Sequence, residues 1–183
     1  MKLRLTAKIH NAAEDWHKKY NEVWLFSEGL AKVKLNDKWG FVDFKTGKEV
    51  VPPKYDWLGV GTIDVREGGL ARVKLNGKWG YVNKEGEEVI PPKYDEAYPF
   101  HKGLAAVELN GKCGFINTEG KEVIPLDYDS VGSFKEGLAE VKLNGKWGLI
   151  NTKGEEVVPL EYTYTSIEAL KAEALKARKQ TKK

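Results

Sequence analysis

Apolar and polar residues alternate in short runs along most of the chain, and each run ends at turn-forming residues. Within residues 66–92, the runs 70–75 and 78–83 flank Asn76-Gly77, and a third run at 87–91 follows Asn83-Lys-Glu-Gly86. Asn-Gly between alternating runs predicts a type I′ hairpin, and the second turn fits a type I turn followed by a left-handed Gly. The prolines Pro91-Pro92 lack N–H donors, so we expect the strand ladder to end there. The pattern therefore predicts a three-stranded antiparallel meander.

The expected hairpin registers place apolar side chains on both faces of this meander. One face carries Ala71, Val73, Leu75, Val82 and Ile90 around Gly80, and the other carries Leu70, Trp79, Tyr81 and Val89. A sheet that is apolar on both faces must be covered on both, so neighbouring sheets are expected to stack on it. A glycine in a strand often marks a close approach, and we expect Gly80 to admit a side chain of the adjacent repeat.

The same pattern occurs four times. Gly-Leu-Ala begins at Gly29, Gly69, Gly103 and Gly137, and the spacing between successive copies is about 34 to 40 residues. The octapeptide Val-Lys-Leu-Asn-Gly-Lys-Trp-Gly recurs unchanged at 73–80 and 141–148. We expect an all-β array of four three-stranded repeats over 20–165, at about 20–53, 54–92, 93–126 and 127–162. An open, curved array is favoured over a closed, propeller-like ring, because propeller blades have four strands and about 40 or more residues.

The chain ends and one insertion depart from the repeat. Residues 1–9 alternate as a strand, and 1–19 is interpreted as a capping strand and turn, which would cover a sheet edge or close a ring. Thr165-Ser-Ile-Glu168 is a capping box that predicts a basic helix from about 166 to 179 within the tail 166–183. Residues 58–64 form an insertion in the second repeat, either a long loop or part of a binding face.

Composition limits the class of protein. The 183 residues carry a net charge of +3, and the tail alone contributes a net charge of +4. No apolar stretch is long enough to span a membrane, and the N-terminus lacks the features of a secretory signal. The single cysteine, Cys113, cannot form an internal disulfide. We therefore expect a cytoplasmic protein with no membrane partner.

No catalytic or metal-binding pattern emerges from the residues. The three histidines lack metal-ligand spacing, so neither a metal nor another cofactor is expected. Cys113 stands where the other repeats have Trp and is interpreted as a small apolar residue rather than a nucleophile. Asp56, Asp95 and Asp129 follow the repeated tyrosines and are interpreted as Asx-turn residues. We expect no enzyme.

The repeated aromatic and basic positions are the candidate binding residues. The Trp column either packs between repeats or lines a groove for a ligand, and lysines opposite it on the sheet would stack on its rings. Together with the insertion, the candidates are Trp39, Trp79, Trp147, Lys34, Lys74, Lys142, Trp57, Leu58, Val60 and Ile63. Basic residues at the two ends could contact nucleic acid or an acidic partner, namely Lys2, Arg4, Lys8, Lys176, Arg178 and Lys179.

The motif Gly-Leu-Ala-x-Val-x-Leu-Asn-Gly-Lys-Trp-Gly, followed by Glu-Val-[Val/Ile]-Pro, resembles the WG-repeat (KWG) family of bacterial β-repeat proteins over about residues 20–162. The resemblance implies an array of small β repeats with no assigned catalytic residues and an interaction role. The first hypothesis is a scaffold that presents a β surface to a protein partner. The alternatives are an accessory or inhibitory subunit of a nucleic-acid-handling complex, acting through the basic ends, and recognition of a carbohydrate or cell wall by the aromatic columns.

Overall fold

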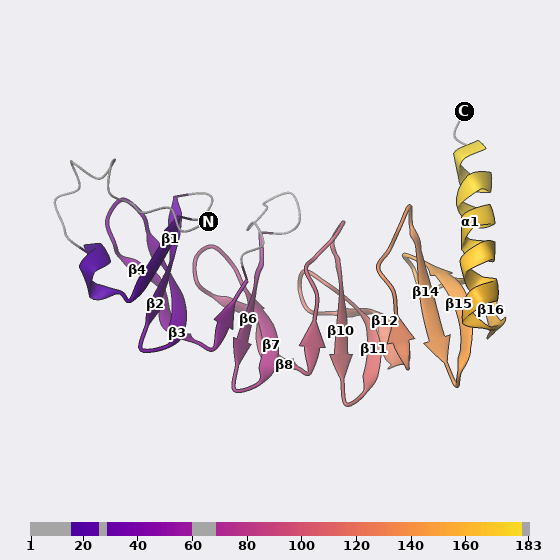
Figure 1. The fold of residues 1–183 in the computed structure, drawn as a ribbon, viewed down its shortest axis with the longest axis horizontal. Helices are drawn as coiled ribbons and strands as arrows, with labels where there is room; N and C mark the ends of the chain where they lie inside the picture. Colours follow the sequence, from indigo (N-terminus) through magenta and orange to yellow (C-terminus); the bar gives the residue numbers. More distant parts are fainter. Residues whose placement is uncertain (1–15, 26–28, 60–68, 181–183) are drawn as a thin grey trace. The chain divides into compact units, whose positions relative to one another are not determined.

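The computed structural model describes residues 16–25, 29–59 and 69–180, except the side chains of 25 and 178–180. These residues form four sheets, each of four antiparallel strands, and a C-terminal helix (Figure 1). The chain divides into an N-terminal unit, residues 1–94, and a C-terminal unit, residues 95–183, each with two sheets. The expectation of a repeat-built all-β fold is confirmed.

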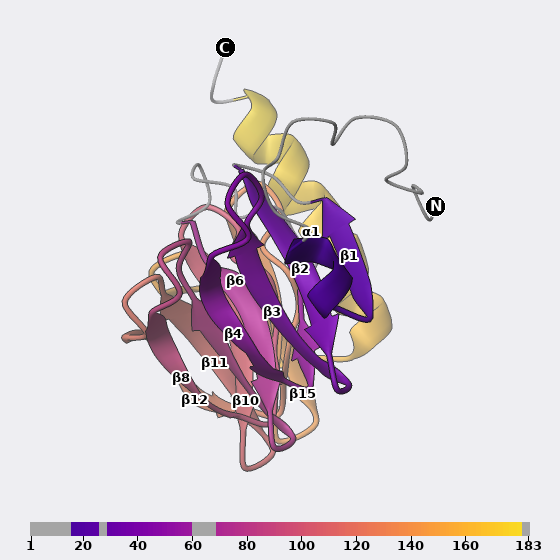
Figure 2. The same ribbon diagram turned by 90° about the vertical axis from the view of Figure 1, so that its left-hand side faces the viewer.

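Each sheet belongs to one repeat and follows chain order. In the N-terminal unit the 3-10 turn η1 (Trp16–Lys19) precedes the first sheet, and the second sheet stacks behind it (Figure 2). The strands of these two sheets are β1 (Glu22–Leu25), β2 (Leu30–Leu35), β3 (Lys38–Asp43) and β4 (Glu49–Tyr55), then β5 (Trp57–Leu58), β6 (Ala71–Leu75), β7 (Lys78–Val82) and β8 (Glu88–Tyr94).

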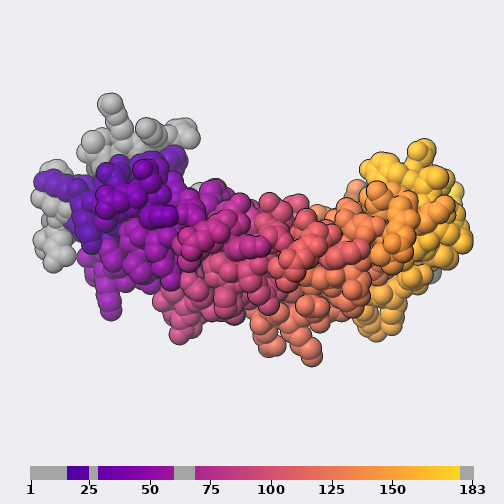
Figure 3. Space-filling view, turned by 90° about the horizontal axis from the view of Figure 1, so that it is seen from below, coloured from indigo at the N-terminus to yellow at the C-terminus, as the bar shows by residue number. Residues whose placement is uncertain are grey.

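The C-terminal unit repeats this arrangement and adds a helix. Its sheets consist of β9 (Glu96–Ala97), β10 (Leu104–Leu109), β11 (Lys112–Asn117) and β12 (Glu122–Tyr128), then β13 (Ser130–Val131), β14 (Leu138–Leu143), β15 (Lys146–Asn151) and β16 (Glu156–Tyr162). The helix α1 (Tyr164–Gln180) follows and lies against the last sheet (Figure 3).

The number of strands per repeat differs from the expectation. The segment after each Tyr was expected only to connect repeats, but it forms a short first strand that pairs with the next. In the second repeat, Trp57 pairs with Lys74 and Leu58 with Val73. The prediction of three strands per repeat is therefore wrong, because each sheet has four. Two residues suffice to add the short first strand. The strand count no longer separates an open array from a ring, and only the short repeat period supports the open form.

The hairpins follow the turn chemistry of the sequence. Asn76 and Gly77 have φ angles of 50° and 80°, as a type I′ turn requires, and Val73 pairs with Gly80 as expected. At the second turn Gly86 has a φ of 89°, and the side chain of Asn83 accepts the backbone N–H groups of Glu85 and Glu87 at 3.1 and 2.9 Å. These local contacts explain why both turns could be predicted.

The glycine of Trp-Gly lies against the two prolines of the next strand. The strand was expected to end at these prolines, and the glycine was expected to admit a side chain of the adjacent repeat; both expectations were wrong. Strand β8 continues through Pro91-Pro92, because Tyr81 pairs with Ile90 and Trp79 with Tyr94, which leaves the prolines in a bulge. Ile90 therefore shares the face of Tyr81. A Cβ on Gly80 would lie less than 3.0 Å from backbone atoms of Ile90 and both prolines. The glycine thus admits the bulge of its own sheet, not a side chain of the adjacent repeat.

Stacked sheets bury the core of each unit. In the N-terminal unit, Phe41, Val51 and Tyr55 of the first sheet pack against Leu58 and Val73 of the second, and all five are fully buried. The corresponding interface of the C-terminal unit is a cluster made by Phe115, Ile124, Ala139, Val141 and Ile150. We call these the first interface and the last interface. They show that, within each unit, a neighbouring repeat covers an apolar face of the sheet before it, as expected.

Local aromatic and helical contacts protect the outer sheets. The ring of Trp16 lies 6.2 Å from that of Phe44 and 6.3 Å from that of Tyr20, so η1 packs on the first sheet. The proposed capping strand at 1–9 lies outside the described residues.

At the other end, Ile167 of α1 is fully buried and the ring of Tyr164 lies 5.0 Å from that of Trp147. The helix begins earlier than predicted, because its N-cap is Thr163, whose hydroxyl lies 3.0 Å from that of Ser166.

Candidate functional site

The predicted lysine–tryptophan stacks form in three repeats. Lys34 lies over the ring of Trp39 at 5.4 Å, and Lys74 over that of Trp79 at 4.9 Å. Lys142 lies 5.7 Å from the ring centroid of Trp147. Each pair stands on adjacent strands in directly opposed positions, which brings cation and ring within range of a cation–π contact. The Trp rings are partly buried: Trp39 packs against the cluster of the first interface, Trp79 against Trp57 of its own sheet, and Trp147 against Tyr164 of α1.

A buried lysine fills the first interface. Lys32 is 5% exposed, its Nζ lies 3.9 Å from the centroid of Trp39 and 5.7 Å from that of Trp57, and it donates a hydrogen bond to the Leu58 carbonyl at 2.6 Å. Burial lowers the pKa of Lys32 from 10.5 to about 8. The rings and the carbonyl act in the opposite direction, because they stabilise the ammonium form. Lys32 was not among the sequence candidates.

The second repeat places an arginine at the same position. The guanidinium of Arg72 lies 5.2 Å from the ring of Trp57 and 5.1 Å from that of Trp79, and the two rings meet edge-on at 5.0 Å. The candidates Trp57 and Trp79 are thereby engaged within the N-terminal unit. Leu58, another candidate, is fully buried in the first interface and serves the core.

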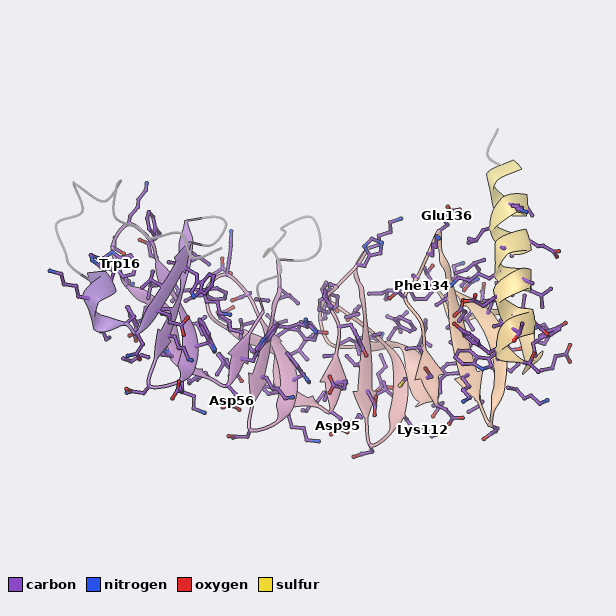
Figure 4. The ribbon with its side chains drawn as sticks, in the orientation of Figure 1. Trp16, Asp56, Asp95, Lys112, Phe134 and Glu136 are labelled. Carbon is purple, nitrogen blue, oxygen red and sulfur yellow. The ribbon has the colours of Figure 1, made fainter. Side chains whose placement is uncertain are left out.

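The last interface contains a hollow instead. A cavity of about 340 Å³ opens there between the third and fourth repeats. The rings of Phe115 and Phe134 lie 4.6 Å apart along it, and Tyr98 is 57% exposed. It is lined by Tyr98, Pro99, Phe100, His101, Leu104, Ala106, Phe115, Ser133 and Phe134. Phe134 lies toward the end of the sheets where Glu136 is found, away from Lys112 (Figure 4).

Small residues at three equivalent positions accompany this hollow. The third residue after the repeat glycine is Lys32 in the first repeat and Ala106 in the third, where it lines the cavity. The Trp39 position is Cys113, and the Trp57 position of the following repeat is Ser130. Burial raises the pKa of the Cys113 thiol, which fits its interpretation as an apolar residue. Among the described residues, a buried lysine therefore occupies this position in the first interface, whereas the last interface has a cavity beside Ala106.

Two recurrent polar contacts link one repeat to the next. Asp129 accepts the backbone N–H of Asn144 at 2.7 Å and the ammonium of Lys112 at 2.7 Å, and Asp56 does the same for Asn76 and Lys38. These aspartates therefore bind hairpin turns 15 or 20 residues away. The expectation of local Asx turns was wrong, because the partner turn becomes adjacent only through strand pairing.

The second contact joins a Tyr-Lys pair to a glutamate of the next repeat. Tyr55 donates a hydrogen bond to Glu88 at 2.6 Å, and Lys54 binds the same oxygen at 2.8 Å. These two donors hold the pKa of Glu88 below its usual value. Both contacts stabilise the stack, and neither forms a reactive group.

The remaining candidates fall at the margins of the described chain. Val60 and Ile63, like Lys2, Arg4 and Lys8, lie outside the described residues. Lys176 is exposed on α1, while Arg178 and Lys179 belong to the same helix, their side chains not being described. Among the described residues, no cluster of His, Cys, Asp and Glu is placed to hold a metal ion, and no described helix is long and apolar enough to cross a membrane.

Comparison with known proteins identifies the class. The family described as "WG containing repeat" matches five successive segments, 17–39, 39–79, 79–113, 114–147 and 147–167. These matches cover most of the chain. The protein therefore belongs to the WG-repeat family, as its motif indicated.

Other comparisons add little. No curated protein matches the chain. Among solved structures, "Crystal structure of the eukaryotic initiation factor" is similar at 10% identity and a TM-score of 0.46, and the chain spans 45% of its length while 79% of this chain is covered. A symmetrical protein from a study of de novo evolutionary emergence shares 7% identity over 80% of this chain and 74% of that one, with a TM-score of 0.28.

A plant lectin from Cicer arietinum shares 16% identity, with 72% of this chain and 86% of the lectin covered and a TM-score of 0.23. Likenesses this weak carry no argument about fold or function.

Proposed function

We propose that this protein is a non-enzymatic interaction module that presents a repeat-built β surface to a protein partner. The hollow at the last interface carries the proposal, since it is concave and rich in aromatic rings. Rings of Phe and Tyr beside an open cavity are typical of the places where proteins anchor a partner's side chain. The ion pair between Lys112 and Asp129 helps to hold together the two sheets that enclose the hollow.

Site-specific photo-cross-linking tests the proposal. A photoreactive phenylalanine analogue replaces Tyr98, which lines the hollow and is 57% exposed, in the full chain. The control carries the same group at Trp24, the equivalent position of the first repeat, which is 37% exposed. Both variants are irradiated in lysate of the source organism, and the products are identified by mass spectrometry.

The proposal is supported if a polypeptide is cross-linked from position 98 but not from position 24. The same polypeptide should no longer be cross-linked when the probe at position 98 is combined with Phe134→Ala. Equal labelling from both positions, or none from position 98 that exceeds the control, would refute it. Circular dichroism of each variant verifies that the sheets remain intact.

A further inference from the structure

We infer that the hollow of the last interface binds the side chain of a lysine or arginine supplied by a protein partner. The inference rests on the proposed function and names the chemistry of its ligand. Its basis is the comparison of two interfaces built on the same repeat. In the first, a long basic side chain lies between aromatic rings; in the last, the chain offers rings and a carboxylate but no basic side chain at that position.

The first interface shows what this place in the fold accommodates. Lys32 extends from its strand, lays its ammonium 3.9 Å from the centroid of Trp39, and remains 5% exposed. In the second repeat, Arg72 occupies the same position and lies over two indole rings. A cation on an aliphatic stem therefore fits this location between rings, and Ala106 leaves the corresponding space open.

Compared with the first interface, the last interface carries less positive charge, which favours the binding of a cation. Ala106 replaces a basic residue, and Glu108 replaces the lysine that stands at the positions of Lys34, Lys74 and Lys142. Glu108 lies two residues from Ala106, hence on the same face of β10. Its carboxylate lies 3.9 Å from the Cys113 thiol, and it forms no ion pair within the described part of the chain. Relative to the first repeat, this face has lost two positive charges and gained a negative one.

The lining supplies the remaining requirements. Phe115, Phe134 and the buried Phe100 present ring surface to an aliphatic stem, and the exposed Tyr98 extends it toward solvent. His101 stands among these residues, while Lys102 and Glu136 border an adjoining smaller hollow. Glu108 is not among the residues that line the cavity; it lies two positions beyond Ala106 on β10, and its carboxylate contacts the Cys113 thiol. A partner's basic side chain would enter past Tyr98 and direct its charge toward Glu108.

Titration with single residues tests this directly. N-acetyl-lysine methylamide and the uncharged N-acetyl-norleucine methylamide are added to isotopically labelled full-length protein, and amide shifts are followed by NMR. We expect the lysine probe to shift the signals of 104–106, 115 and 133–134 and to bind at least about tenfold more tightly than norleucine. Equal affinity for both probes would overturn the inference, because the site would then recognise apolar surface alone.

Two variants and a control locate the binding. Glu108→Gln should weaken the lysine probe at least about threefold and leave the norleucine probe unchanged, whereas Glu119→Gln, in an exposed turn, should alter neither. Ala106→Lys should abolish binding by filling the hollow from within, as Lys32 does; Ala106→Leu serves the same purpose if that variant does not fold. Unchanged lysine binding in Ala106→Lys, or in Ala106→Leu where it is used instead, would refute the assignment.

The outcome is separable from that of the proposed function. A partner captured from position 98 without any response to the lysine probe would retain the interaction role and refute the ligand. A lysine-specific response with no cross-linked partner would retain the ligand assignment and refute the interaction with a protein partner.

Discussion

The glycine of each Trp-Gly pair gives the sharpest test of how a repeat is built. In the third repeat, a Cβ on Gly114 would lie less than 3.0 Å from backbone atoms of Ile124 and Pro125. The substitution Gly114→Ala therefore forces the bulged strand away from its neighbour. Because those atoms belong to the backbone, no side-chain rotation can relieve the overlap.

The expected cost follows from the same distances. Overpacking in a well-packed region costs roughly 1–3 kcal/mol, and a clash with backbone beside a proline belongs at the upper end. About 3 kcal/mol corresponds to a fall in Tm of roughly 6–12 °C for a chain of this size. The matched control is Gly132→Ala in the same unit, where the nearest atom to an added Cβ is that of Glu140 at 3.6 Å, an ordinary contact. This variant should change stability by less than about 0.5 kcal/mol.

Urea unfolding of both variants, followed by tryptophan fluorescence and by circular dichroism, measures the difference. Coincidence of the two signals establishes whether unfolding is two-state, as the free-energy comparison requires. Similar midpoints for Gly114→Ala and Gly132→Ala would refute the explanation by backbone overlap. Rescue of Gly114→Ala by shortening a side chain in an adjacent repeat would instead support the original expectation for this glycine.

Three further predictions concern the charged contacts. Lys32 has a pKa of 10.5 in the unfolded chain and of about 8 in the folded protein, so the unfolded state binds more protons between these pH values. The free energy of unfolding of the wild type should therefore rise between pH 8 and 10.5 relative to that of Lys32→Met, by up to about 3 kcal/mol. Urea titrations at several pH values measure this rise. Glu88→Gln should cost about 1 kcal/mol at pH 7 through its contact with Tyr55, and the cost should vanish as the pH falls through the lowered pKa of Glu88; a constant cost in the same titrations would contradict this. Lys171→Met should cost about 2 kcal/mol by leaving Glu140, whose side chain is 13% exposed, without its 2.8 Å partner, and hydrogen exchange should locate the loss in α1.

Local chemistry explains how much of the fold could be predicted. Asn76-Gly77 and Asn83 determine their turns through atoms a few residues away, so both turns and the register of the first hairpin could be predicted from the sequence. The bulge at Pro91-Pro92 was not, because it depends on pairing between Trp79 and Tyr94 across the sheet. The short first strands were missed for a related reason. Two residues are too few to show an alternating pattern, and only the adjacent strand defines them.

The candidate site was harder to predict from the sequence than the fold. Cys113 interrupts the Trp-Gly motif and is therefore conspicuous, whereas Ala106 stands at a position that differs in every repeat. Stacking of two sheets is what places Ala106 beside Phe134, some 28 positions away in the sequence numbering. The signal was nevertheless present in the sequence. Aligned, the repeats show small residues at Ala106, Cys113 and Ser130 and a carboxylate, Glu108, where the other repeats have lysine.

The residue that follows Gly-Leu-Ala differs in every repeat and makes a different contact in each. This position carries Lys32, Arg72, Ala106 and Glu140 in turn, which pair across their hairpins with Phe41, Tyr81, Phe115 and Leu149. Lys32 fills the first interface, Arg72 lies over indole rings, and Glu140 binds Lys171 of the capping helix. Ala106 lines the cavity of the last interface. Since the recurring residues of the motif build the sheet and its bulge, the contacts that distinguish one repeat from another include those made at this position: a buried lysine, an arginine over indole rings, an alanine lining a cavity and a glutamate bound to α1.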